Sequence, residues 1–322
     1  MLASAAPRES GRDNPVLARE VWLLGGVLAL LVGVAGWLSP AFLGAGNLGN
    51  LAVQAAPLCL AVLGQMLVIL ARGLDLSVGS LMATVAVAAT AFETTSNAMT
   101  LPICAATLAL AAAVGWANGW LVVRRGVSPF LATLAMMIVL QGARFAYTKG
   151  APSGELPPAL RLLGTGTLVG VPVSLLLVAA VSVALVLLLH RTTFGRRIYV
   201  TGTNPRAAAL VGIDAGAVTI ACYVLGALLS GLAGLVLIGY VGTVDNWVGR
   251  GYELDSIVAA VIGGVVLGGG AGSVLGALLG ALILVVLFNL VLLLGLPVEL
   301  QLVIKGLVIL LAAAVHATRM PR

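Results

Sequence analysis

Long runs of apolar residues, separated by short polar stretches, dominate the hydropathy pattern of this chain. Most runs approach the ~20 residues that an α-helix needs to cross the hydrocarbon core of a bilayer. The runs are continuous rather than alternating, which favours membrane-spanning helices over the strands of a β-barrel. The pattern therefore predicts an all-α polytopic membrane protein with about ten transmembrane helices, at 21–38, 48–71, 76–92, 101–123, 127–147, 167–190, 216–240, 254–267, 273–294 and 300–317.

The composition agrees with a membrane protein. Of the 322 residues, 61% are hydrophobic and 9% are charged, against about 45–50% and about 25% in soluble domains. The 41 glycines suit close helix packing in lipid. The glycine-rich stretch 268–273 lacks the lysine of a phosphate-binding loop, so we expect no ATPase or other enzymatic activity in this chain. Cys59, Cys104 and Cys222 lie apart within predicted spans, and we expect neither a metal nor a cofactor.

The distribution of basic residues predicts the orientation. With a cytoplasmic N-terminus, ten spans leave both termini in the cytoplasm and place 12 of the 17 Lys and Arg residues on that side. This is the bias of the positive-inside rule, and adding or removing an early span would destroy it. The cytoplasmic residues would be Arg8, Arg12, Arg19, Arg72, Arg124, Arg125, Arg191, Arg196, Arg197, Arg206, Arg319 and Arg322. The residues on the opposite side, some of them within spans, would be Arg144, Lys149, Arg161, Arg250 and Lys305.

Three regions follow from this topology. Residues 1–20 are expected to form a polar cytoplasmic tail, residues 21–317 the transmembrane domain, and residues 318–322 a second cytoplasmic tail. The first apolar run is long enough to span and is not followed by a good cleavage site, so we expect it to be retained.

The longest cytoplasmic loop, 191–215, contains the signals of a short helix. Asn204 can cap it, Pro205 suits its first position and Gly212 can end it. The apolar residues Ala207, Leu210 and Val211 would share one face. So short a helix needs a packing partner to be stable. That partner would be another protein or the lipid surface.

An internal repeat relates the two halves. Residues 73–78 (GLDLSV) resemble residues 251–256 (GYELDS), and each stretch opens a short span rich in small residues. Asn118 and Asn289 then occupy the following spans of the two halves. An offset of five spans predicts an inverted 5+5 repeat, with a pathway at the repeat interface. The competing explanation is chance similarity between two apolar segments of low complexity.

Charged residues next to the spans are the candidate functional groups, because a charge in the bilayer centre is costly. They are Asp75, Glu253, Asp255 and Lys305. Asp75 and Glu253 precede short spans, where a carboxylate also suits a helix N-terminus. Lys305 would lie inside the last span and can pair with Glu253 or Asp255. Few other spans carry ionisable groups, which weakens the case for an ion-coupled carrier.

Four motifs in this order resemble the ribose/monosaccharide permease family of ABC importers. They are GLDLSVGSLMA (73–83), SPFLATLAMM (128–137), TTFGRRIYVTGTNPRAAALVGI (192–213) and GYELDSIVAAVIGGVVLGGGAGSVLGALLGALI (251–283). The resemblance implies a dimer of permease subunits in a bacterial inner membrane, driven by a separate ATPase that binds the ATP and supplied by a periplasmic binding protein. The second permease would be another copy or a paralogue.

The resemblance also implies roles for particular residues. The segment 203–213 would be the coupling helix that docks into a cleft of the ATPase, and the regions 73–80 and 251–264 would flank the translocation pathway. The coupling residues are expected to be Gly195, Thr203, Asn204, Pro205, Arg206, Ala207, Ala208, Gly212 and Ile213. The pathway residues are expected to be Asp75, Ser77, Asn118, Phe130, Thr133, Glu253, Asp255, Asn289 and Lys305.

The chain departs from the family pattern at several positions. Gln141 stands where members often have Arg, Ala135 where they have Gly, and Val265-Val266 where a Thr-Ser pair is common. Polar lining near 254–267 is thereby reduced, which leaves the cargo open between sugars and another small polar solute such as an amino acid. The residues are also compatible with an ion-coupled secondary transporter and with an integral-membrane enzyme or scaffold.

Overall fold

The computed structural model describes residues 15–152, 154–243, 245–297, 299–304, 306–307 and 310, without the side chains of 15–18 and 20. Within these ranges the secondary structure is helical apart from one short antiparallel hairpin, β1 (Thr167–Leu168) with β2 (Val171–Pro172). The helices are α1 (Pro15–Leu38), η1 (Pro40–Leu43), α2 (Ala45–Leu70), α3 (Val78–Thr90), η2 (Asn97–Met99), α4 (Thr100–Arg124), α5 (Pro129–Thr148), α6 (Pro158–Thr165), α7 (Val173–Arg191), α8 (Thr193–Thr203), α9 (Pro205–Leu210), α10 (Ala215–Val241), α11 (Tyr252–Ile262) and α12 (Val274–Leu293).

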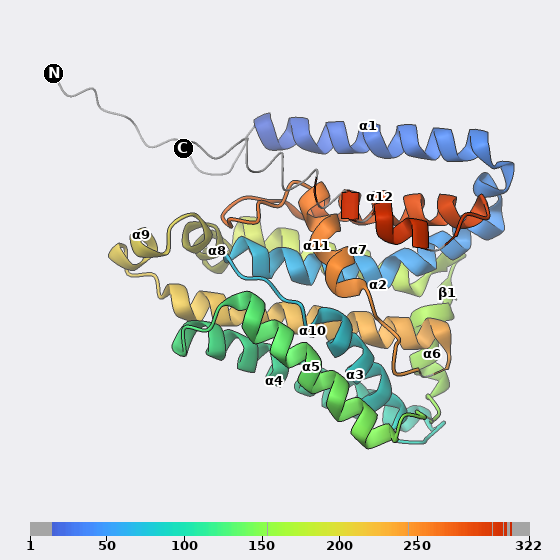
Figure 1. The fold of residues 1–322 in the computed structure, drawn as a ribbon, viewed down its shortest axis with the longest axis horizontal. Coiled ribbons are helices and arrows are strands. Elements are labelled where there is room, and N and C mark those ends of the chain that lie inside the picture. The colour runs from blue at the N-terminus through green and yellow to red at the C-terminus, as the bar shows by residue number, and fades with distance from the viewer. Residues whose placement is uncertain are drawn as a thin grey trace.

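Seven helical segments among the described residues are long and apolar enough to cross a membrane. They belong to α1, α2, α4, α5, α7, α10 and α12, and each coincides with a predicted span. Most of these helices lie side by side along the long axis of the molecule, with α1 at one edge (Figure 1). The prediction of an all-α polytopic membrane protein is therefore confirmed.

Two predicted spans are short helices. The span predicted at 76–92 is α3, with 13 residues, and the span predicted at 254–267 is α11, with 11 residues. At about 1.5 Å per residue, neither covers the ~30 Å of a bilayer core alone. The last predicted span, 300–317, lies largely outside the described residues, as does most of both predicted tails. The count of ten spans stays a prediction.

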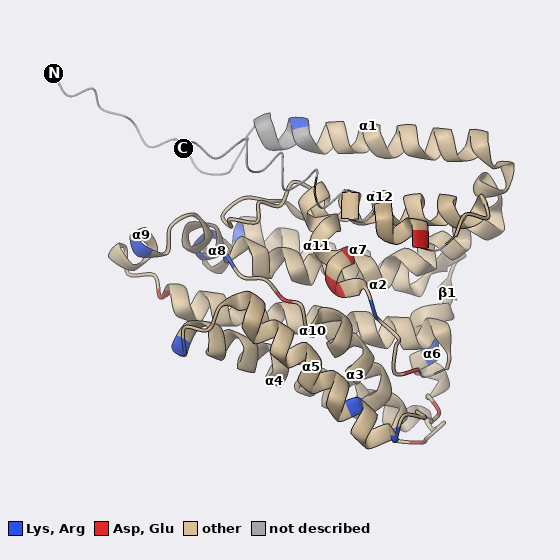
Figure 2. Cartoon of the chain, in the orientation of Figure 1, with Lys and Arg blue, Asp and Glu red and all other residues tan. Residues whose placement is uncertain are grey.

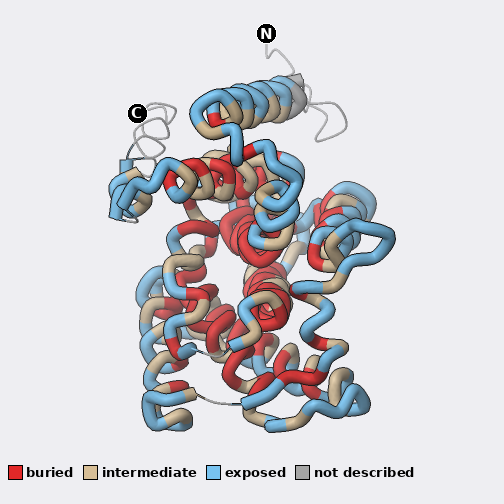
Figure 3. The backbone as a smooth tube through the Cα atoms, turned by 90° about the vertical axis from the view of Figure 1, so that its right-hand side faces the viewer, coloured by how far each residue is buried: buried red, intermediate tan, exposed pale blue. Residues whose placement is uncertain are grey.

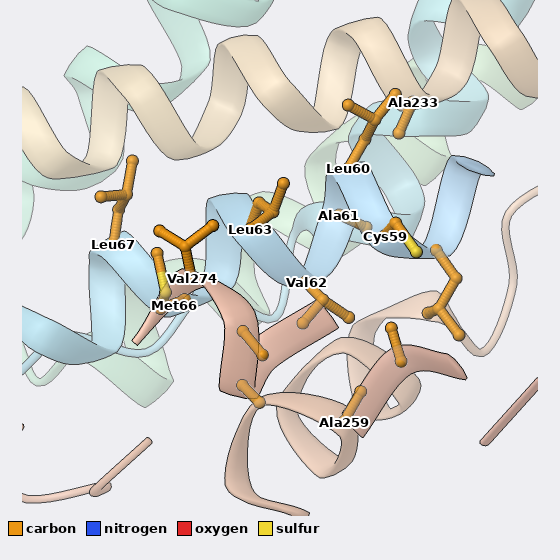
Figure 4. Close-up of a cluster of buried hydrophobic side chains, with 14 of the residues drawn as sticks. Cys59, Leu60, Ala61, Val62, Leu63, Met66, Leu67, Ala233, Ala259 and Val274 are labelled. Atoms are coloured by element: carbon orange, nitrogen blue, oxygen red, sulfur yellow. The ribbon is translucent and has the colours of Figure 1, made fainter. Parts of the chain in front are cut away.

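The core lies around α2 and α10. Every residue of α2 from Ala55 to Leu70 is buried. The two helices are in close contact where Gly64 of α2 meets Gly226 of α10, since a Cβ on either glycine would touch the backbone of the other. Small residues allow this approach in a membrane bundle. Figure 4 shows side chains of α2 directed toward Ala233 on one side and toward Ala259 and Val274 on the other. Burial is concentrated at this centre, whereas α1 is mostly exposed (Figure 3).

The region between α5 and α7 differs from the prediction. The span predicted at 167–190 begins as a helix only at Val173. Residues 167–172 form the β1–β2 hairpin instead, because Val169 and Gly170 both have positive φ angles, of 52° and 79°. Such a pair is typical of a two-residue hairpin turn. The helix α6, which was not predicted, precedes this hairpin. Its Gly164 packs against the backbone of Gly239 and Tyr240 in α10.

Candidate functional site

The linker between α2 and α3, residues 71–77, passes through the bundle without regular structure. In a membrane interior its backbone polar groups must find partners within the protein. Tyr223 of α10 supplies one set, because its hydroxyl accepts from the Leu74 amide at 3.3 Å and donates to the Leu74 carbonyl at 3.1 Å. Thr133 of α5 supplies another, because its hydroxyl accepts from the Leu76 amide at 3.1 Å. Two neighbouring helices therefore fix the course of this linker.

Asp75, at the centre of the linker, has an exposed fraction of 1%. Its carboxylate accepts hydrogen bonds from the amide of Ser77 at 2.8 Å and from the Ser77 hydroxyl at 2.6 Å. The Ser77 hydroxyl in turn accepts from the Asn118 side chain at 3.0 Å. Gln65 completes the set, since its amide in the favourable orientation bonds the Asp75 carbonyl at 3.1 Å and the Asp75 amide at 3.2 Å. Asp75 is thus held by hydrogen bonds from Ser77 and by backbone hydrogen bonds with Gln65.

The N-terminal ends of α3 and α11 lie side by side. Gly79, in the first turn of α3, faces Glu253 in the first turn of α11, and a Cβ on Gly79 would collide with the Glu253 carboxylate and with the Gly249 carbonyl. The Glu253 carboxylate accepts from the Gly251 amide at 3.1 Å and 3.2 Å. Two helix N-termini, with their partial positive charges, therefore lie beside acidic residues. The acidic residues of α11 lie near mid-length of the bundle (Figure 2).

The candidate pathway residues separate into groups. Asp75, Ser77, Asn118 and Thr133 meet around the linker, and Glu253 and the buried Asp255 lie on the first turn of α11. The other three candidates are placed differently, although Asn289 and Asp255 line the same pocket. Asn289 of α12 pairs with Asn47 of α2 through two amide hydrogen bonds of 3.1 Å. Phe130 is 51% exposed on the surface of the subunit. Lys305 lies outside the described residues.

Sequence reasoning missed residues that support this site. Gln65 and Tyr223 are polar residues in the interior of apolar spans, and that position was the signal that could have identified them. Arg144 was used only to count basic residues, but it is 5% exposed. Its guanidinium donates to the Ser80 carbonyl, to the Thr84 hydroxyl at 3.0 Å and to the Asn246 carbonyl at 3.3 Å. Arg144 therefore ties α5 to α3 and to the segment that precedes α11.

The helix predicted in the loop 191–215 is present as α9. The Asn204 side chain caps it by accepting from the Arg206 and Ala207 amides at 3.0 and 3.1 Å. Gly212 follows it with a φ of 75°, which a residue with a side chain rarely adopts. The apolar residues Leu210 and Val211 are 89% and 70% exposed. Basic residues gather around this end of the bundle (Figure 2).

A second helix, α8, precedes α9 in the same loop and was not predicted. Thr192 caps it by accepting from the Gly195 amide at 3.1 Å, and Gly195 packs on carbonyls at the end of α7. α8 ends at Thr203. In α9, Ala208 is buried, whereas Arg206 and Ala207 are exposed. The Ile213 amide donates to the Ala208 carbonyl at 3.0 Å, which closes the end of α9.

α8 lies at a junction of three backbone segments. Gly202 packs so closely on the Leu70 carbonyl and on Gly270 that no side chain fits there. The Gly270 amide donates to the Leu70 carbonyl at 3.0 Å, and the Tyr199 hydroxyl donates to the Gly272 carbonyl at 3.0 Å. Burial raises the pKa of the Tyr199 phenol, so this donor keeps its proton. α8 thus contacts both the linker that follows α2 and the loop that follows α11.

Comparison with known proteins identifies relatives over almost the whole chain. A family model described as branched-chain amino acid transport system / permease component matches residues 47–313. The ribose import permease protein RbsC of Escherichia coli (strain K12) is 40% identical over 293 residues, 89% of this chain and 91% of that protein. RbsC of Bacillus subtilis (strain 168) is 38% identical over 88% of this chain and 89% of that protein.

A third relative carries a different sugar in its name. The galactose/methyl galactoside import permease protein MglC of Escherichia coli (strain K12) is 31% identical over 315 residues, 92% of this chain and 94% of that protein. No solved structure matches the chain.

Proposed function

The chain belongs to the permease family of the branched-chain amino acid transport system type, and from this premise we propose that it is the membrane-spanning subunit of an ABC importer for a monosaccharide. The observation that carries the proposal is α9, a capped helix outside the long helices with Leu210 and Val211 exposed. Exposed apolar residues on so short a helix favour a protein partner.

The proposed partner of α9 is a separate ATPase in the cytoplasm. Closure of the ATPase pair around ATP would move α9, and α8 would pass this movement to the linkers on either side of it. Arg206 is exposed and can pair with an acidic group of the ATPase, which would fix the register of the contact. Gly195, Thr203 and Ile213 would shape the segment rather than contact the partner. A periplasmic binding protein and a second permease subunit would complete the importer.

We place the translocation pathway beside the short helices α3 and α11. Their adjacent N-termini, at Gly79 and Glu253, suit a site between two inverted halves. The pairing of α2 with α10 at Gly64 and Gly226 supports the same 5+5 arrangement. In this scheme ten spans cross an inner membrane with both termini in the cytoplasm. Asp75, Glu253 and Asp255 would be its acidic residues, with Lys305 as their counter-charge.

A monosaccharide is the proposed cargo because the relatives named above are ribose and galactose import permeases. An amino acid is the second candidate, and it rests on the description of the family model. An ion-coupled carrier is disfavoured by the hydrogen-bonded state of Asp75, because its carboxylate is engaged with Ser77 rather than open to an ion.

Co-purification in mild detergent, followed by reconstitution into liposomes, tests the function. We expect an ATPase to co-purify, and we expect monosaccharide uptake to require ATP and a binding protein. Uptake by this chain alone, driven by an ion gradient without ATP, would refute the proposal. Uptake of leucine instead of a sugar by the complete importer would show that the cargo is an amino acid.

A further inference from the structure

A pocket of about 320 Å³ lies between α2, α10, α11 and α12, apart from the Asp75 linker. We infer that this pocket is a binding station for a neutral polyhydroxylated solute, a monosaccharide in its ring form, on the way into the subunit. The inference rests on the proposed function and names the place where the cargo contacts this chain. A volume near 300 Å³ is at the small end of ligand sites, which suits a single sugar ring.

The polar groups of the pocket match the hydroxyls of a sugar. Asp255 offers a carboxylate, Gln54 and Asn289 offer amides, and Tyr240 and Tyr252 offer hydroxyls. Amides and phenols both donate and accept, so they can follow the alternating donors and acceptors of a polyol. The Gln54 amide already donates to the Tyr240 hydroxyl at 3.2 Å, which shows that these two groups converge.

The apolar groups of the pocket suit the other face of a sugar. Phe288, Tyr240 and Tyr252 are its aromatic lining residues, and Leu58 and Val285 are among the aliphatic ones. A sugar ring has C–H groups that pack against such surfaces while its hydroxyls keep polar partners.

Asp255 is the charged residue among the described residues that line the pocket. The ammonium group of an amino acid can pair with this carboxylate, but none of the described lining residues is basic, so the amino acid's own carboxylate would have no ionic partner among them. A neutral polyol needs neither ionic partner, so the described lining favours a sugar.

The position of the pocket fits an entry station. Gln54 lies in the half of α2 that is remote from Leu70, where α2 contacts α8. Asp255 belongs both to the pocket and to the first turn of α11, next to the junction of α3 and α11. A solute in the pocket would therefore lie between the end of the bundle opposite α8 and α9 and the proposed pathway.

Two variants of the reconstituted importer test the pocket, Tyr240→Phe and Gln54→Leu. Each removes polar groups and keeps most of the volume. Their matched controls are Tyr147→Phe, which removes the hydroxyl of a residue that is 66% exposed, and Asn50→Leu, which removes an exposed amide one turn before Gln54. We expect the pocket variants to lower maximal ribose uptake at least fivefold, without change in ATPase activity stimulated by the binding protein. Both controls should keep the parent rate.

A labelling experiment measures occupancy directly. Gln54→Cys, in the complex with Cys59, Cys104 and Cys222 replaced by alanine, should react with a membrane-impermeant maleimide, and millimolar ribose but not leucine should slow the reaction. If the parent importer works, normal uptake by both pocket variants together with no protection by ribose would overturn the inference. Loss of uptake in the parent complex itself would instead refute the proposed function.

Discussion

The hydroxyl of Tyr223 in α10 bonds both backbone groups of Leu74, 149 residues earlier in the chain, at 3.3 Å to the amide and 3.1 Å to the carbonyl. One side chain thus completes the hydrogen bonding of a residue that has no helical partner. It also joins the linker of the first half of the chain to the long central helix of the second half. Movement of α10 along its axis would therefore move the linker that carries Asp75.

Tyr223→Phe should destabilise the protein, because the Leu74 amide loses its acceptor inside the bundle. We expect a decrease in the free energy of unfolding of about 1–2 kcal/mol, visible as a lower thermal midpoint in detergent. Tyr147→Phe is the control, since Tyr147 is 66% exposed and its hydroxyl should contribute little. Equal midpoints for the two variants would show that the Tyr223 hydroxyl does not hold the linker.

Gly202→Ala should disrupt the junction of α8 with the end of α2 and the loop that follows α11. A methyl group there would overlap the Leu70 carbonyl and the Gly270 backbone, neither of which can rotate away. Overpacking of this kind costs roughly 1–3 kcal/mol, and the displaced α8 should also uncouple ATP hydrolysis from uptake. Gly142→Ala is the control, because no atom beyond its chain neighbours and its own helix backbone lies within 4 Å of the added methyl group. The junction would lose its proposed role if Gly202→Ala matched this control in both thermal stability and uptake.

Ala207→Glu and Leu210→Glu should block docking of the ATPase on α9. Both residues are exposed, so the substitutions leave the fold and membrane insertion intact while placing a charge on the proposed contact face. We expect little ATPase to co-purify and stimulated ATP hydrolysis to disappear. Gly212→Val should act in the same way, because its φ of 75° is strained for valine.

Val169→Glu is the matched control for the α9 variants. Val169 is 96% exposed in the hairpin between β1 and β2, and α6 and β1 lie at the end of the bundle opposite α9 (Figure 1). It should retain the ATPase fully. Normal ATPase stimulation in Ala207→Glu and Leu210→Glu would place the docking surface elsewhere.

Asp75→Asn and Asp75→Ala separate a structural from an electrostatic role. The asparagine oxygen can still accept from the Ser77 amide and hydroxyl, whereas alanine leaves both without a partner. We expect Asp75→Asn to keep the parent thermal midpoint and Asp75→Ala to lose about 1–3 kcal/mol of unfolding free energy. If Asp75→Asn folds normally but abolishes uptake, the negative charge itself serves transport.

The sequence was informative where stabilisation is local. The cap at Asn204 and the positive φ at Gly212 depend on a few adjacent residues, so α9 could be predicted almost residue by residue. The long helices followed from apolar runs, because a bilayer fixes their length. The four motifs also predicted the family correctly, as the match over residues 47–313 confirms.

Tertiary contacts explain what the sequence did not disclose. α8 depends on Gly202 fitting against Leu70 and Gly270, residues far away in the chain. Asn289 was expected to match Asn118, but it pairs with Asn47 of α2, a partner that no periodicity indicates. The direct contact between Gly79 and Glu253 was not predicted either, because the regions 73–80 and 251–264 were expected only to lie beside a common pathway.

Thiol labelling at two exposed sites tests the proposed orientation. Val169 and Leu210 are 96% and 89% exposed and lie on either side of α7, one of the helices long enough to span. In a chain expressed without the ATPase, with Cys59, Cys104 and Cys222 replaced by alanine, Val169→Cys should react with an impermeant maleimide added to intact cells. Leu210→Cys should react only after the membrane is opened. The parent chain without cysteines should react in neither case. Reaction of both sites from the same side would mean that α7 does not cross the membrane. The reverse pattern would put α9 outside, away from any ATPase, and would invert the charge bias on which the ten-span scheme depends.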